Sequence, residues 1–399
     1  MENNKYFLLI LITSSAFGIL LGIFTNKIDA NLSEKENDLF SNNNDKDNKE
    51  KEKDSNEKIK ENNEEEKEKE EEEENKDEEE KKGEIEKIQT EKDKKENEIK
   101  YKYKYTNDNK LRIAVAYGTD NKYIYPTIVS MTSLVDTAGK NTFYDIYIMH
   151  TPDFTQNSKN FLKTVEEKYP SKCTIIFFNM GNKYKGLSLN FRISTPAYYR
   201  LSLPNLLPDV DKIIWLDGDT LVFEDLTELI KLDMKDNVTM GFLDSQPDAI
   251  KSFGFKNATV LCSGVLLMNL KLLRKYDYPK KIEKFIQENK GKLTQQDQTI
   301  VNVVFQGRIA PLPPKYGIWA WGDKGAAKKH LDKQRPWLKY NEEEFFYAVE
   351  HPAILHYIWP KPFWRKKTPF DTEWWDYARK TGYYDDIYNK SPIPNIKWR

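Results

Sequence analysis

The chain has 399 residues, of which 32% are charged and 38% hydrophobic, and its formal net charge is only −1. Its two cysteines exclude a fold held by a disulfide framework, and no basic face with interleaved aromatic residues indicates nucleic-acid binding. The near-zero charge conceals two chemically different parts, a highly charged low-complexity segment and a longer segment with the composition of a folded domain.

An apolar, nearly uncharged run occupies Tyr6–Phe24, between Lys5 and Lys27. At roughly 1.5 Å per residue, a helix of this length crosses most of a hydrocarbon layer about 30 Å thick. The run predicts a membrane anchor or a signal peptide, and its length favours the anchor because signal peptides usually have a shorter apolar region. We therefore expect residues 1–30 to be a single-pass signal-anchor. If this segment is cleaved instead, the protein is secreted.

Residues 31–110 are dominated by Glu, Lys, Asn and Asp, and their scattered apolar residues form no heptad pattern. Such a segment cannot bury enough apolar surface to offset its conformational entropy, and a coiled coil would lack its apolar seam. We expect a disordered or partly helical stalk. An anchor and a stalk together favour the lumen of the Golgi or endoplasmic reticulum. Asn-x-Ser/Thr triplets at Asn31, Asn237, Asn257 and Asn389 are compatible with this location.

Residues 111–399 have the pattern of an α/β domain in which short apolar runs alternate with helical periodicity. The predicted strands are Ile113–Tyr117, Tyr144–His150, Thr174–Phe178, the run that leads into Asp217, Val238–Leu243 and Val265–Asn269. The predicted helices are Thr127–Asp136, Gln156–Tyr169, Pro196–Leu206, Lys280–Asn289 and Gln296–Phe305. This alternation is typical of a doubly wound sheet, here followed by a basic, aromatic C-terminal part.

The most informative stretch runs from Lys212 to Val222 and carries Asp217 and Asp219 directly after a buried strand. Ligands of open α/β sheets bind at the carboxyl ends of strands, where two oxygens one residue apart can hold a hard divalent cation. The same residues are also compatible with a hairpin, because Asp217-Gly218 favours a type I′ turn. The stretch by itself leaves both interpretations open.

Polar residues follow or interrupt other predicted elements. Thr119-Asp120-Asn121 follows the first strand, where it could read a base and ribose by hydrogen bonds or simply form an Asx turn. Arg200 lies on an otherwise apolar helix, from which it reaches either solvent or an anion.

The second half of the chain adds three further features. Gly264 permits another group to approach the backbone closely within a strand. Asp297-Gln298 lies at the start of an apolar helix, where polar residues can also serve simply as helix caps. His356 is one of only four histidines and lies in an apolar run. A histidine there is often a core residue, but with the two aspartates it would suit Mn²⁺ better than Ca²⁺. Lys361 could hold a phosphate as a point charge.

In their order along the chain, these motifs resemble family 8 of the retaining glycosyltransferases, the group of glycogenin and the bacterial lipooligosaccharide galactosyltransferases. The resemblance extends from Arg112 to Trp364 and rests on Thr119-Asp120-Asn121, Tyr199-Arg200-Leu201, Leu216-Asp217-Gly218-Asp219, Ser263-Gly264-Val265-Leu266-Leu267, Gln296-Asp297-Gln298, His356-Tyr357 and Lys361-Pro362. It implies a GT-A fold, which is a Rossmann-like doubly wound mixed sheet. It also implies transfer of a hexose from a UDP-sugar, such as UDP-glucose or UDP-galactose, to a glycan, glycoprotein, glycolipid or other hydroxyl acceptor.

The resemblance also implies site residues. Mn²⁺, or Mg²⁺, would be held by Asp217, Asp219 and His356. The donor would be bound by Thr119, Asp120, Asn121, Arg200, Cys262, Ser263 and Lys361, with Asp120 and Asn121 at the uridine and Lys361 at the diphosphate. Asp297 would face the donor sugar and Gln298 the anomeric carbon. Two positions depart from the family pattern: Cys262 stands where an Asn often touches the sugar, and Trp359 where a Gly often approaches the diphosphate.

Two other functions compete with catalysis by a glycosyltransferase. A catalytically inactive, membrane-tethered carbohydrate-binding or scaffold protein would explain Cys262 and Trp359, but it would not explain the complete set of polar motifs. A metal-dependent phosphohydrolase would need more carboxylate or histidine ligands than four histidines readily supply. The tryptophans of the C-terminal part could stack on an acceptor sugar or fill the core; they are Trp319, Trp321, Trp337, Trp364, Trp374 and Trp375.

Overall fold

The computed structural model describes residues 103–187, 194–246, 250–293, 295–321, 323–334, 338–358, 361–364 and 367–390. The chain divides into two compact units, Met1–Ile99 and Lys100–Arg399, and every described residue belongs to the second. The expected anchor at 1–30 and most of the expected stalk lie outside the described residues. Within the described part, no helix has the length and apolar character needed to cross a membrane.

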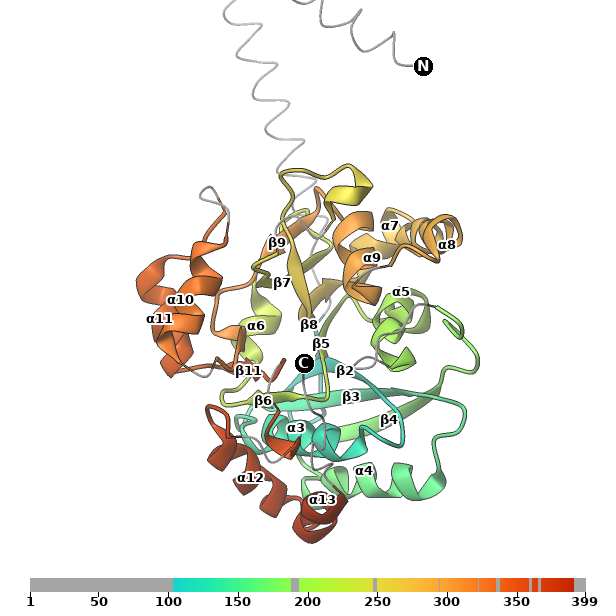
Figure 1. Cartoon of the computed structure of the whole chain (residues 1–399). Coiled ribbons are helices and arrows are strands. Elements are labelled where there is room, and N and C mark those ends of the chain that lie inside the picture. Colours follow the sequence, from blue (N-terminus) through green and yellow to red (C-terminus); the bar gives the residue numbers. More distant parts are fainter. Residues whose placement is uncertain are drawn as a thin grey trace, which may run out of the picture. The chain divides into compact units, whose positions relative to one another are not determined.

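The second unit is built on an eight-stranded mixed sheet with the order β4-β3-β2-β5-β8-β7-β9, and β1 pairs with β2 outside this path (Figure 1). β4, β3, β2 and β5 run parallel to one another, whereas β8 runs antiparallel to both β5 and β7. The strands are β1 (Lys104–Tyr105), β2 (Leu111–Thr119), β3 (Thr142–His150), β4 (Cys173–Asn179), β5 (Lys212–Leu216), β7 (Thr239–Leu243), β8 (Leu261–Asn269) and β9 (Ile309–Pro311). The predicted mixed α/β sheet is thus confirmed.

Helices cover this sheet, and Figure 1 shows α3 and α4 beside β2 to β4, with α7, α8 and α9 grouped beside β8. The helices are α3 (Ile124–Asp136), α4 (Gln156–Lys168), α5 (Leu203–Leu206), α6 (Thr227–Lys231), α7 (Leu270–Lys275), α8 (Tyr278–Asn289), α9 (Gln296–Val304), α10 (Lys324–Asp332), α11 (Glu342–Glu350), α12 (Asp371–Lys380) and α13 (Tyr384–Lys390). Three short 3₁₀ helices are η1 (Thr195–Ser202), η2 (Lys251–Phe253) and η3 (Pro362–Trp364).

The predicted helix at Pro196–Leu206 is correct in place but not in type, since its first part is the 3₁₀ helix η1 and only its last turn is the α-helix α5. Pro204 explains the break, because it lacks the N–H group that a continuous α-helix would need at this position, whereas Pro196 lies in the first turn, where proline is tolerated. The domain also starts earlier than the expected boundary at residue 111. β1 pairs with β2 through Lys104↔Arg112, so ordered structure reaches into the segment that was expected to be stalk.

A second, three-stranded sheet has the order β10-β11-β6, with β10 (Tyr316–Trp319), β11 (Ile354–His356) and β6 (Thr220–Val222). β5 pairs with β2 and β8, whereas β6 pairs with β11. The hairpin interpretation of Asp217-Gly218 is therefore wrong, because the strands on either side of it belong to different sheets. The pairing of β6 with β11 brings His356 opposite Thr220, directly beside the two aspartates.

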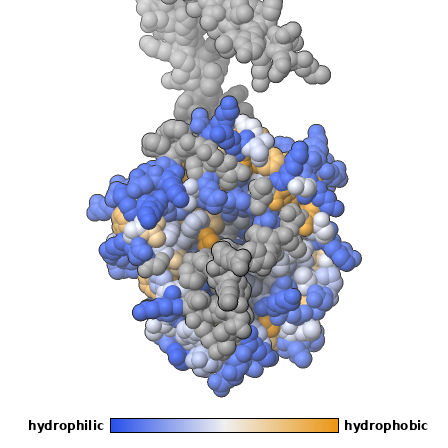
Figure 2. Space-filling view, in the orientation of Figure 1, coloured by the Kyte–Doolittle hydropathy of each residue, from blue (hydrophilic) through white to orange (hydrophobic). Residues whose placement is uncertain are grey.

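Apolar residues are sorted as expected for a folded domain. β2 is buried throughout Ile113–Tyr117, and all nine residues of β8 are buried. Among the described residues, the exposed large hydrophobic side chains are three tyrosines, Tyr105, Tyr347 and Tyr388. Figure 2 accordingly shows a surface that is largely hydrophilic where it is coloured, with small hydrophobic areas between. The described surface therefore has no extended apolar patch in this view.

Candidate metal centre and donor site

The three side chains expected to hold a metal lie together at the junction of the two sheets. Asp217 follows β5, Asp219 precedes β6, and His356 ends β11. His356 Nε2 lies 3.3 Å from Asp219 Oδ1 and 3.8 Å from Asp217 Oδ2. One potential ligand atom from each residue lies within 4.8 Å of the others. The tertiary fold thus joins a pair of carboxylates to an imidazole from a strand far along the chain.

The arrangement fits a divalent cation. Asp219 Oδ1 is buried and has no hydrogen-bond partner among the described residues, which is costly for a carboxylate oxygen unless a cation binds it. Two carboxylates and one imidazole form a donor set that suits Mn²⁺ better than Ca²⁺. We conclude that Asp217, Asp219 and His356 are chemically able to hold such an ion, and their role as ligands stays a prediction.

Two residues of β8 fix the ring of His356. A Cβ atom at Gly264 would lie only 1.9 Å from His356 Cε1. The His356 ring therefore occupies the space that the side chain of any other residue at position 264 would need. Cys262 Sγ lies 3.7 Å from His356 Nδ1. Burial alone would lower the pKa of His356, but Cys262 and the charge of Asp217 outweigh it, and the pKa is raised. Cys262, expected at the donor sugar, is placed here against the histidine.

Arg200 connects the carboxylates. It is only 1% exposed, and its Nη2 lies 2.7 Å from Asp217 Oδ1, while its Nε lies 3.0 Å from Asp297 Oδ2. Its Nη1 donates a hydrogen bond to the carbonyl of Ser263, and its guanidinium stacks 4.4 Å from the ring of Trp215. The Trp215 indole also donates to Asp217 Oδ1 at 2.8 Å. These contacts fix the orientation of Asp217 and leave its other oxygen facing His356.

Asp297 and Gln298 open α9 on the other side of Arg200. Asp297 is 3% exposed, and burial raises its pKa to about 6; Arg200 opposes this shift and the charge of Asp217 adds to it. Gln298 Oε1 accepts a hydrogen bond from the Ser263 N–H at 3.1 Å, and its Nε2 donates to Asp244 Oδ2 at 2.9 Å. Asp297 is thus linked through Arg200 to Asp217, and Gln298 is fixed against β8 through Ser263; their catalytic roles remain predictions.

Lys361 contacts the outer oxygen of Asp219. Its Nζ donates to Asp219 Oδ2 and to Tyr123 Oη, the latter at 2.8 Å, and the Tyr123 hydroxyl itself donates to Asp219 Oδ2 at 2.8 Å. Burial raises the pKa of Tyr123 well above its usual value. Tyr123 was not expected from the sequence, where nothing distinguishes it from the other tyrosines. Its only local signal is that it follows Asp120, whose Oδ1 accepts a hydrogen bond from the Tyr123 N–H at 3.0 Å.

The last residue of β2, Thr119, and the two polar residues that follow it hold the loop that leads into α3. Asp120 Oδ1 accepts from the first backbone N–H groups of this loop, as in an Asx turn. Asn121 Oδ1 accepts from Ser158 Oγ at 2.7 Å, and Thr119 Oγ1 lies 3.1 Å from Thr127 Oγ1. The Asx turn is therefore present, and contact of these residues with uridine stays a prediction.

The aromatic C-terminal part is mixed in character. Trp374 is fully buried against Phe363, with ring centroids 5.8 Å apart, so it fills the core. Trp319, Trp321 and Trp375 are partly exposed. The other positions of interest, Trp337 and Trp359 and the side chain of Trp364, lie outside the described residues.

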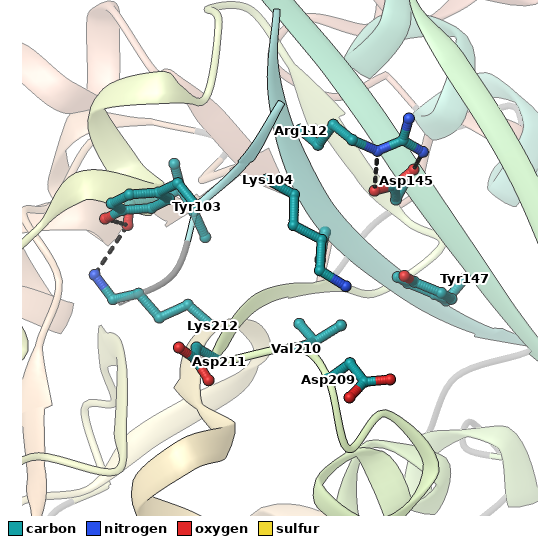
Figure 3. A pocket seen from close by; sticks show the side chains of 11 residues that line it. Tyr103, Lys104, Arg112, Asp145, Tyr147, Asp209, Val210, Asp211 and Lys212 are labelled. Carbon is teal, nitrogen blue, oxygen red and sulfur yellow. Dashed lines mark hydrogen bonds and ion pairs between the residues drawn. The ribbon is translucent and has the colours of Figure 1, made fainter. Parts of the chain in front are cut away.

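A separate small pocket of about 40 Å³ lies near the amino ends of β2 and β5, away from the aspartates that follow β5 (Figure 3). Three of its charged groups are engaged by neighbours: Arg112 Nε donates to Asp145 Oδ2 at 2.9 Å, and Lys212 Nζ donates to the Ile230 carbonyl at 2.9 Å. Burial lowers the pKa of Lys212 to about 8. The pocket therefore has a structural explanation in the packing of β1 and α6 against the sheet.

Comparison with known proteins identifies the family. The sequence model of the family described as "Glycosyl transferase family 8" matches residues 114–368. A lipopolysaccharide 1,2-glucosyltransferase of Escherichia coli is 25% identical over 305 residues, which cover 73% of this chain and 82% of that protein. General stress protein A of Bacillus subtilis (strain 168) is 24% identical over 208 residues, which cover 50% of this chain and 70% of that protein.

Solved structures establish the same fold. The galactosyltransferase LgtC, in complex with donor and acceptor sugar analogs, matches with a TM-score of 0.55 and 24% identity, covering 71% of this chain and 98% of LgtC. The apo bifunctional glycosyltransferase WbbM matches with a TM-score of 0.58 and 20% identity, covering 70% of this chain and 52% of WbbM. The family resemblance inferred from the order of motifs is confirmed.

Proposed function

The chain belongs to glycosyl transferase family 8 and is a glycosyltransferase, and from that premise we propose that it is a metal-dependent, retaining hexosyltransferase with a UDP-sugar donor. The observation that supports this proposal most strongly is the joint placement of Asp217, Asp219 and His356 with the Arg200–Asp297 ion pair and Lys361. The name of the Escherichia coli relative, a glucosyltransferase, supports a hexose donor such as UDP-glucose or UDP-galactose. The acceptor would be a glycan or another hydroxyl compound.

The leaving diphosphate is stabilised by positive charge where negative charge develops. Asp217, Asp219 and His356 would hold a divalent cation, and a cation bound there would supply Lewis-acid stabilisation of the diphosphate oxygens. Lys361, at the edge of the same cluster, supplies a second positive charge to these oxygens. With both charges present, the departing group needs no protonation by a protein acid.

The donor sugar would be held on the opposite side of the cluster. Arg200 and Asp297 are fixed to each other and to Asp217, so they would orient the sugar hydroxyls with little rearrangement. A covalent intermediate would need a carboxylate at the anomeric carbon, and the matching position holds Gln298, an amide and a poor nucleophile. We therefore favour attack of the acceptor hydroxyl on the same face from which the diphosphate leaves, with the phosphate taking the proton.

The competing function is carbohydrate binding without turnover on the same fold. It is less well supported, because both aspartates, His356, Asp297 and Gln298 are gathered at one junction of the fold. Attachment to a membrane through residues 1–30 and location in the Golgi or endoplasmic reticulum lumen remain part of the proposal and rest on the sequence alone.

The experiment that tests this function is UDP release by the purified protein against a panel of UDP-sugars, with and without added hydroxyl acceptors. We expect release from one UDP-hexose, even slowly without acceptor, and an α-configured product from an α-linked donor by NMR. Tight UDP binding without release from any donor would instead support the carbohydrate-binding alternative. A product of inverted configuration would refute the same-face route.

A further inference from the structure

The two oxygens of Asp219 have different surroundings. Oδ1 faces His356 Nε2 at 3.3 Å and accepts no hydrogen bond from any described residue. Oδ2 receives hydrogen bonds from Lys361 Nζ and from the Tyr123 hydroxyl. One side of the carboxylate is therefore open to a cation, whereas the other is engaged by an ammonium group and a phenol.

Both charges of this pair are desolvated, since Asp219 is 5% and Lys361 is 8% exposed. A buried carboxylate is stable only when a nearby positive charge compensates it. A bound divalent cation and the Lys361 ammonium would compensate the same carboxylate and repel each other across it. The cation therefore binds more favourably when Lys361 has another negative partner.

The diphosphate of the donor is such a partner, because a lysine ammonium binds phosphate oxygens as a point charge. We propose that Lys361 alternates between Asp219 in the nucleotide-free protein and the diphosphate in the donor complex, and thereby couples cation binding to nucleotide binding. The inference rests on the proposed function. Tyr123 holds Lys361 in the first position, since it accepts a hydrogen bond from Nζ and donates one to the same carboxylate oxygen.

Coupling of this kind is reciprocal: the factor by which UDP raises Mn²⁺ affinity equals the factor by which Mn²⁺ raises UDP affinity. Without nucleotide, Lys361 lowers the affinity of the site for the cation. A site arranged in this way holds its cation mainly when a donor is present. If the ion pair only stabilises the fold, its removal will lower the melting temperature and leave Mn²⁺ affinity in the absence of UDP unchanged or weaker.

The test is a titration of the full-length protein with Mn²⁺, with and without UDP. Electron paramagnetic resonance of the free Mn²⁺ measures how much of the ion is bound. For the wild type we expect UDP to raise Mn²⁺ affinity at least about fivefold. Lys361→Met keeps an unbranched side chain of nearly the same length but removes its charge, so the variant should bind Mn²⁺ without UDP at least about fivefold more tightly than the wild type. Lys361→Arg keeps the charge and should resemble the wild type.

Melting curves establish that each variant is folded, and Lys361→Gln replaces Lys361→Met if the latter is not. Unchanged or weaker Mn²⁺ binding by the folded uncharged variant without UDP would overturn the proposal. Equal Mn²⁺ affinity of the wild type with and without UDP would overturn it even if no variant folds. A wild type that binds no Mn²⁺ with UDP present would reject the metal dependence in the proposed function as well. Coupling in the wild type together with an unaffected Lys361→Met would reject the alternation alone.

Discussion

Gly264→Ala is the sharpest test of how the fold positions His356. The added Cβ would lie 1.9 Å from His356 Cε1, 2.5 Å from Nδ1 and 2.6 Å from Nε2, in a strand whose residues are all buried. Ordinary contact between carbon atoms begins near 3.4 Å, so the ring must retreat by about 1.5 Å. The Nε2 atom now lies 3.3 Å from Asp219 Oδ1, and a shift of this size removes it from the position where it could share a cation with that oxygen.

We expect Gly264→Ala to weaken Mn²⁺ binding in the presence of UDP by about 10- to 100-fold, as is typical when a ligand loses its supporting contact. The rate of UDP release should fall by about 100-fold or more, because a misplacement near 1 Å has effects of this size. Overpacking of the strand by the added methyl group should also lower the free energy of unfolding by about 1–3 kcal/mol. The assays must therefore be run at a temperature at which the variant is still folded.

The matched control is Gly291→Ala. Gly291 is exposed, and a Cβ there would meet no atom within 4 Å, so this variant should retain wild-type metal affinity and stability. A Mn²⁺ titration and a melting curve for each variant separate loss of the site from loss of the fold. Wild-type Mn²⁺ affinity in folded Gly264→Ala would refute the argument that this glycine makes room for a metal ligand.

Burial lowers the pKa of His330 to about 4 from an ordinary value of 6.5, so its neutral form is favoured in the folded state. The contribution of the neutral histidine to the free energy of unfolding is complete above pH 6.5 and is lost as the pH falls towards 4, by about 3 kcal/mol in all. Denaturant unfolding at pH 7 and at pH 4 should therefore show a smaller fall in the free energy of unfolding for His330→Gln than for the wild type. An identical fall in both proteins would contradict this role of His330. Trp215→Phe keeps an aromatic ring but removes the N–H that donates to the Asp217 carboxylate. We expect this variant to have a free energy of unfolding about 1.5–3 kcal/mol lower than the wild type and to release UDP more slowly. No change in either quantity would count against a role of the indole N–H in orienting Asp217. Cys262→Ala removes the sulfur beside His356 Nδ1, whereas Cys262→Ser keeps a polar group there. We expect Cys262→Ala to bind Mn²⁺ more weakly than Cys262→Ser. Equal Mn²⁺ affinity of Cys262→Ala and the wild type would show that the contact with Cys262 does not position the His356 ring.

The sequence predicted the central sheet well, because its strands are short apolar runs with strong periodic signals. β2, β3 and β4 were expected within a few residues of their bounds, and Asp217 was expected at the end of β5. The order of polar motifs along the chain then predicted the family. Side chains at the carboxyl ends of β2 and β5 lie close together in any sheet of this kind, so their proximity follows from the topology.

The second sheet could not be predicted in the same way. β6 and β11 have only three residues each, too few to show a period, and they pair across a long stretch of intervening chain. The contact of Lys361 with Asp219 follows from that pairing and from the loop after β11, neither of which has a local signal. Tyr123 was missed for a similar reason, since its place in the cluster depends on a hydrogen bond to Asp219, which lies far along the chain in the turn between β5 and β6.

UDP release from a UDP-hexose by the wild-type protein and by Asp219→Ala, each with Mn²⁺ and with EDTA, tests most directly whether a cation held by Asp217, Asp219 and His356 drives cleavage of the donor. We predict release by the wild type with Mn²⁺, its loss in EDTA, and no Mn²⁺-dependent release by folded Asp219→Ala. Release at the wild-type rate by this variant, or by the wild type in EDTA, would contradict the proposed role of the cluster.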